Sequence, residues 1–145
     1  MASWSEFCDV AGAYGGKRVG ANGWAFEVQG RGADRSQKVY AFHETMPPDL
    51  QFVQLTSAFA MIEAVDCAEV LRSCGQMTAG SIGYSPRFDA NGDEAGGFLS
   101  LSTSVPLALL DLSEPLRLLL HINILAQAAD GLEQRYAPSG LPDVF

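Results

Sequence analysis

The sequence predicts an α+β domain in which helices pack on a mostly antiparallel five-stranded sheet, in the order α-β-β-β-α-β-β-α. Three observations predict this arrangement. Apolar residues recur at helical spacing at both ends of the chain, they alternate with period two between those ends, and turn signals mark the boundaries. The chain has 145 residues, of which 48% are apolar and 18% are charged, enough to bury a core. We expect one domain over residues 1–137 and a C-terminal tail over residues 138–145.

A short helix is expected first. Ser3 followed by Glu6 is a capping box, in which each side chain accepts a hydrogen bond from a free backbone N–H at the helix start. Apolar residues then recur at helical spacing, and Gly15 and Gly16 end the helix.

Three strands should follow this helix. Residues 24–29 alternate in polarity, residues 37–43 form a second strand, and residues 50–61 form a third, longer one. The second and third strands are apolar on both faces over part of their length. That pattern predicts either cover on both sides of the sheet or an exposed apolar patch on one side.

The next predicted elements are a second helix and two strands. Asp66 and Glu69 begin the helix, which runs to about Cys74 and should bury an apolar stripe of Cys67, Val70, Leu71 and Cys74. Residues 79–88 and 96–105 then form strands. The second of them alternates Leu and Val with Ser, so one of its faces should be core and the other wet.

The longest helix closes the domain. Ser113 is its expected N-cap, Pro115 is tolerated in the first turn, and Pro138 stops the helix after about Tyr136. The first half of this helix is apolar nearly all round, and such a helix must bury more than one face. We therefore expect a homodimer.

The charge balance limits the partners of the chain. It carries 17 acidic and 9 basic residues, a net charge of −8. An acidic surface repels phosphate, so no nucleic-acid partner is expected. The most apolar run, residues 116–129, contains Arg117 and His121 and is too short to span a bilayer, so no membrane partner is expected either.

The cysteines and the N-terminus favour a cytoplasmic protein. The chain has an odd number of cysteines, Cys8, Cys67 and Cys74, and no C-x-x-C motif. This pattern predicts reduced thiols and no disulfide framework. The opening "MASWSEF" has neither the basic nor the apolar region of a signal peptide.

The stretch "FDANGDEAGG" spaces Asp89, Asn91 and Asp93 like the ligands of an EF-hand calcium loop. An EF-hand loop needs Gly at its sixth position and Glu at its twelfth. Counted from Asp89, these positions hold Glu94 and Ser100. Asn-Gly is also a strong turn dipeptide. A hairpin loop is therefore predicted, without a metal.

No other motif amounts to an active site. Ser81 lacks the strand-to-helix turn of a nucleophile elbow, and "GRGADR" lacks the third glycine of a dinucleotide loop. His43 and His121 show no zinc-ligand spacing with each other or with the cysteines. We expect no catalytic residues, no metal and no cofactor.

The stretch from "FVQLTSAFAM" through the helix "AEVLRSC" and the strand ending "VPL", with the closing "AADGLE", resembles the YbjN-like domains. It is also similar to class I type III secretion chaperones of the Tir-chaperone type, which are small and acidic. The resemblance covers roughly residues 50–137. It implies an α+β fold, a bacterial homodimer and binding of extended client segments, although Cys74-Gly75 stand where many members carry Asn.

We therefore expect a non-enzymatic, chaperone-like module that holds an extended segment of a client protein or peptide. The expected binding surface consists of large apolar residues on the first three strands: Trp24, Phe26, Tyr40, Phe42, Phe52 and Val53. The alternative is a small-ligand sensor or small enzyme with a pocket under the long C-terminal helix, which rests on His121 and nearby acids.

Overall fold

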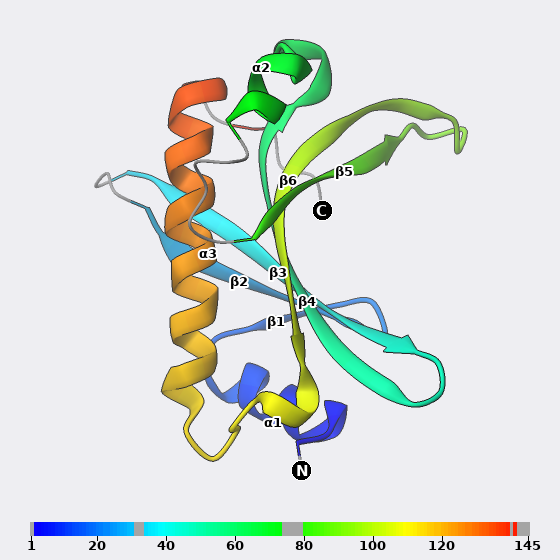
Figure 1. Ribbon diagram of the computed structural model, residues 1–145, viewed down its shortest axis with the longest axis vertical. Coiled ribbons are helices and arrows are strands. Elements are labelled where there is room, and N and C mark those ends of the chain that lie inside the picture. The colour runs from blue at the N-terminus through cyan, green and yellow to red at the C-terminus, as the bar shows by residue number, and fades with distance from the viewer. Residues whose placement is uncertain (1, 31–33, 74–79, 140, 142–145) are drawn as a thin grey trace.

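The fold is an α+β domain built on one antiparallel sheet (Figure 1). The computed structural model describes residues 2–30, 34–73, 80–139 and 141. Six strands form the sheet, in the order β1-β2-β3-β4-β6-β5, and every neighbouring pair is antiparallel. The predicted class is confirmed, and the predicted count of five strands is corrected to six.

The element bounds agree closely with the sequence patterns. The elements are α1 (Trp4–Ala13), β1 (Lys17–Val19), β2 (Gly23–Gln29), β3 (Ser36–Met46), β4 (Leu50–Met61), η1 (Ile62–Ala64), α2 (Cys67–Arg72), β5 (Ser81–Phe88), β6 (Glu94–Pro106), η3 (Leu107–Leu109) and α3 (Pro115–Tyr136).

Strand β1 is the element that the sequence patterns miss. It has only three residues, two of them basic, so no period-two alternation can be read from it. It forms because the chain turns back directly after α1 and pairs Lys17 with Ala25 and Val19 with Gly23. Gly15 makes this turn possible, since its φ of 86° is a conformation that side chains with a Cβ rarely adopt.

The predicted capping box of α1 is present. The Ser3 hydroxyl accepts a hydrogen bond from the Glu6 backbone, and the Glu6 carboxylate accepts one from the Ser3 backbone at 2.7 Å. Phe7 and Ala11 are the buried residues of this helix. They belong to the main core cluster, which places α1 on the same side of the sheet as the other helices.

Helix α2 and the start of α3 differ from expectation. Val70 is the buried residue of α2, whereas Leu71 is exposed, because six residues give the helix room for a single inward position. Cys74 lies outside the described residues. Ser113 does not cap α3: its backbone N–H and its hydroxyl donate to Asp111, and Glu114 occupies the N-cap position without a side-chain hydrogen bond.

Alternation along the strands separates two faces of the sheet. Trp24 pairs with Ala41, and Ala41 pairs with Leu55, so these residues share one face. That face carries the core, because the buried sheet residues that belong to it cluster with inward residues of α1, α2 and α3. No helix among the described residues packs on the opposite face, which we call the open face.

Helix α3 provides most of the cover. It crosses β2, β3, β4 and β6 on the core side (Figure 1). Its inward residues are Leu118, Ile122, Leu125, Ala126 and Ala129, all buried. The predicted end of this helix at Tyr136 is confirmed. Among the described residues, no helix has the length and apolar character needed to cross a membrane.

The orientation of α3 leads to a stability prediction. Ile122→Ala should lower the free energy of unfolding by about 2–5 kcal/mol, because the methyl and methylene groups that it removes are fully packed. The matched variant Ile124→Ala changes the same side chain on the outer side of the helix and should cost well under half as much. Urea unfolding measures both. Equal losses would contradict the assigned orientation.

Candidate functional site

The six residues expected to form a binding surface divide between the two faces of the sheet. Trp24, Phe26 and Val53 point toward the helices and belong to the main core cluster. Their burial corrects the expectation for these three, which stabilise the fold and are not accessible to a partner. Their neighbours in the chain alternate to the other face, as strand geometry requires.

The other three expected residues lie on the open face. Tyr40 pairs with Ala25 and Thr56, and Phe42 pairs with Gly23 and Gln54, in adjacent positions of the same row. The rings of Tyr40 and Phe42 stack with centroids 6.2 Å apart. Tyr40 is only 7% exposed, while Phe42 and Phe52 are half-buried. Phe42 and Phe52 are therefore the accessible apolar part of this group.

A hollow of about 470 Å³ lies beside these aromatic residues, where β1, β2 and β3 meet. Among its lining residues, those on the open face are Lys17, Val19, Ala25, Glu27, Lys38 and Tyr40. Two ammonium groups therefore lie near one end of the open face, in a chain whose net charge is −8.

Hydroxyl groups cover the other half of the open face. Ser102 donates to Thr56 at 2.8 Å across β6 and β4, and the Ser85 and Ser100 hydroxyls lie 3.4 Å apart across β5 and β6. The expected alternation of apolar and serine residues along β6 is present, although Ser100 is buried where a solvent-exposed residue was expected. Short hydroxyl side chains on a strand face can donate to and accept from an extended backbone that lies over them.

The position of the aromatic residues in the sheet limits how a partner could bind. Strands β3 and β4 are central, so a peptide lying over Phe42 and Phe52 cannot extend the sheet by backbone pairing. Only β1 and β5 are at the ends of the strand order. Pro86 and a register shift at Pro86/Phe88 protect one end of β5, which leaves Ser81–Ser85 as its accessible stretch.

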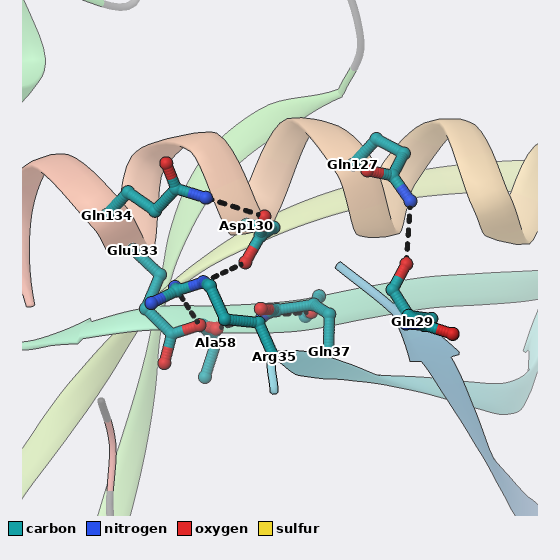
Figure 2. A network of polar contacts seen from close by, with 9 residues as sticks. Gln29, Arg35, Gln37, Ala58, Gln127, Asp130, Glu133 and Gln134 are labelled. Atoms are coloured by element: carbon teal, nitrogen blue, oxygen red, sulfur yellow. Dashed lines mark hydrogen bonds and ion pairs between the residues drawn. The ribbon is translucent and has the colours of Figure 1, made fainter. Parts of the chain in front are cut away.

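A buried ionic network joins the C-terminal half of α3 to the β2–β3 connection (Figure 2). Arg35 Nε donates to Asp130 Oδ1 at 2.9 Å, and its Nη2 donates to Glu133 Oε2 at 3.4 Å. Gln134 Nε2 donates to Asp130 Oδ2 at 3.0 Å. Asp130 is fully buried. Burial is the main cause that raises the pKa of Glu133, and the neighbouring Asp130 adds to the shift, while Arg35 opposes it.

Close packing surrounds this network on the sheet side. A Cβ placed on Gly30 would lie 2.9 Å from Asp130 Oδ1, so a glycine at this position lets the carboxylate approach the backbone. Gln127 Nε2 donates to the carbonyl of Gln29 at 2.9 Å, one helical turn before Asp130. The network is thus a structural clamp between α3 and the sheet. No local sequence signal joins Arg35 and Asp130, which are 95 positions apart.

The thiol of Cys8 has polar neighbours that the sequence did not reveal. Trp24 Nε1 donates to Cys8 Sγ at 3.3 Å, and Arg18 Nη1 lies 3.5 Å from the same atom. The Arg18 guanidinium also lies over the Trp24 ring, 5.4 Å from its centroid. Cys8 and Cys67 are free thiols. These contacts hold α1 against β1 and β2.

The predicted hairpin loop between β5 and β6 is confirmed. Asp89 Oδ1 accepts hydrogen bonds from the backbones of Asn91 at 2.9 Å and Asp93 at 3.0 Å, which closes the turn. One oxygen of the Asp89 carboxylate is therefore already engaged in closing the turn. Among the described residues, no group of three or more His, Cys, Asp and Glu could hold a metal ion.

The remaining candidate side chains do not converge. Ser81 starts β5 and is exposed. His121 is exposed on the outer side of α3. His43 lies within β3, where its ring stacks on Trp4 at 4.7 Å and its Nε2 lies 3.2 Å from Gln51 Oε1. Ser81, His121 and His43 thus lie on three different elements, β5, α3 and β3.

Comparison of the chain with protein-family models, with curated proteins and with solved structures finds no match. The open face of the sheet, with Phe42, Phe52, the hollow and the row of hydroxyls, is the candidate functional site.

The raised pKa of Glu133 predicts a pH dependence of stability. The folded state binds this proton more tightly than the unfolded state, whose carboxyl has a pKa near 4.5. Its contribution to stability therefore falls as pH rises from about 4.5 through the folded-state pKa. In Glu133→Gln the side chain stays neutral at every pH. The free energy of unfolding of this variant, relative to that of wild type, should therefore rise between pH 4.5 and pH 7.5.

Urea unfolding at the two pH values measures this difference. Glu114→Gln is the matched control, because Glu114 is exposed at the start of the same helix and forms a surface ion pair with Arg117 at 2.7 Å. The control should show little change with pH. A Glu133→Gln effect that is flat, or that falls with rising pH, would contradict the assigned cause.

The closed turn predicts that residues 89–94 bind calcium no better than millimolar, because the ligand register is wrong and the Asp89 carboxylate already accepts two backbone hydrogen bonds. Isothermal titration calorimetry with calcium chloride should show no saturable site. A micromolar site that Asp89→Ala abolishes would refute this prediction.

Proposed function

We propose that the protein is a non-enzymatic, chaperone-like module that holds an extended segment of a client protein or peptide against the open face of its sheet. The observation that carries the proposal is the one-sided cover of the sheet: among the described residues, α1, α2 and α3 pack on the core face, and Phe42 and Phe52 lie on the other. Accessible aromatic groups on an uncovered sheet face are typical of a binding surface.

The chemistry of the open face suits an extended chain. Phe42 and Phe52 supply apolar contacts for client side chains that point toward the sheet. The hydroxyls of Ser102, Ser104 and Thr56 lie on the adjoining strands, at positions paired across β4 and β6, and can bond to the client backbone. The acidic remainder of the chain favours a client with basic flanks.

The resemblance to YbjN-like domains and to type III secretion chaperones supports the same proposal. Those families bind extended segments on α+β folds and lack catalytic residues. A chaperone-like fold, a bacterial cytoplasmic setting and a client protein are part of the proposal on this ground.

The alternative function, a small-ligand sensor or small enzyme with a pocket beneath α3, has less support, because the acids under the helix, Asp130 and Glu133, already pair with Arg35. Leu118, Ile122 and Leu125 fill the space between α3 and the sheet. His121 is on the far side of the helix, exposed.

A displayed peptide library selected on the immobilised protein tests the proposed function. Selected peptides should bind wild type and lose at least tenfold in affinity, about 1.4 kcal/mol, for the double variant Phe42→Ser with Phe52→Ser. The matched control is Leu71→Ser with Leu109→Ser, which removes two exposed apolar side chains outside the open face and should leave affinity unchanged. Thermal unfolding verifies that each variant is folded.

Hydrogen exchange with and without a selected peptide locates the contact. Protection is expected in β3, β4 and β6. Protection confined to α3, or affinity unchanged in the double variant, would overturn the proposed site.

A further inference from the structure

The outer side of α3 carries an apolar stripe that nothing in the described part of the chain covers. Leu116, Leu120 and Ile124 are 74%, 57% and 48% exposed. They are spaced four residues apart, so they form one ridge along the helix. The stripe lies opposite the inward residues Leu118, Ile122 and Leu125, which confirms that α3 is apolar on two sides.

The charges around this stripe indicate the chemistry of whatever covers it. The chain has a net charge of −8, yet α3 contains no carboxylate from Pro115 to Ala129. Arg117 bonds to Glu114 at 2.7 Å, so these two charges compensate each other. The neighbours Asn123, which is exposed, and Gln127, which is half-buried, are neutral. This face therefore offers an uncharged apolar ridge, without the acidic rim that a basic partner would require.

We propose that the stripe binds the same stripe of a second copy of this chain, in an antiparallel helix pair whose two-fold axis passes near Leu120. This goes beyond the proposed function, which concerns the opposite side of the molecule. Two acidic molecules can approach each other through these faces without bringing carboxylates together. The identical ridges can interlock as rows four residues apart do in helix packing.

Electrostatics favours the antiparallel arrangement over the parallel one. With the axis at Leu120, Leu116 faces Ile124 of the second copy, and Arg117 faces its Asn123. A parallel pair in register would place Arg117 opposite Arg117 and would align the two helix dipoles unfavourably.

The available area sets the strength of the pair. Three partly exposed aliphatic side chains present a small contiguous apolar area. A standard interface buries about 800 Å² on each partner, so the ridge and its neutral rim form a small interface. We expect a reversible dimer with a dissociation constant in the micromolar range.

Sedimentation velocity of the full chain, from low micromolar to several hundred micromolar, tests the proposal. Wild type should shift from monomer to dimer, and Leu120→Glu should weaken the dimer by more than about tenfold. Leu120 is exposed in the monomer, so this variant should unfold at the same temperature as monomeric wild type. The matched control Leu71→Glu adds the same charge at an equally exposed leucine of α2 and should leave the dimer intact.

Oxidative cross-linking tests the axis independently. A disulfide needs Cα atoms within about 7 Å, so Leu120→Cys should cross-link to itself above the wild-type background, whereas Ile124→Cys should not. A monomer at every concentration would overturn the proposal. A dimer that Leu120→Glu leaves intact, or cross-linking at position 124 and not at position 120, would overturn the assigned interface.

Discussion

The fold depends on one helix covering one face of a six-stranded sheet. Helix α3 has 22 residues and is about 33 Å long, and it crosses four of the six strands. Helices α1 and α2 add cover only at the ends. Since no described helix packs on the other face, the burial of apolar surface is more extensive on the helix-covered side of the sheet than on the other. The open face and the outer stripe of α3 are both consequences of this single-layer cover.

The Arg35–Asp130 pair fixes how α3 is seated. Apolar packing of Leu and Ala along a helix would tolerate small rotations and shifts, because such contacts have no direction. Asp130, fully buried, accepts from Arg35 and Gln134 in a defined geometry, and Gly30 leaves room for it. Burying charge is costly, and the raised pKa of Glu133 shows part of that cost. The orientation that the network imposes is the one that keeps Leu120 outward.

The sequence predicted which residues share a face of the sheet, but not which face is covered. Period-two alternation found β2 to β6 because each has enough residues to show it. Strand β1, with three residues, shows none. Trp24 and Tyr40 are both large aromatic residues on apolar strands. Only the position of the helices decides that Trp24 lies in the core and Tyr40 on the open face. The ionic clamp was beyond sequence reasoning, because its partners meet only through the tertiary fold. The two-sided apolar character of α3, in contrast, was evident from the sequence and is present.

The two candidate surfaces are compatible because they face away from each other. The inward side of α3 contacts the core face of the sheet, so its outer stripe and the open face lie on opposite sides of the molecule (Figure 1). A pair of chains joined through α3 would hold two open faces outward, related by a two-fold axis. Two weak contacts to one client would act together where the client is long enough to reach both faces, since binding at the first face then raises the effective concentration at the second. A shallow, partly polar face such as this one gives modest affinity alone. Pairing through the helix would therefore strengthen client binding without any additional contact on the sheet.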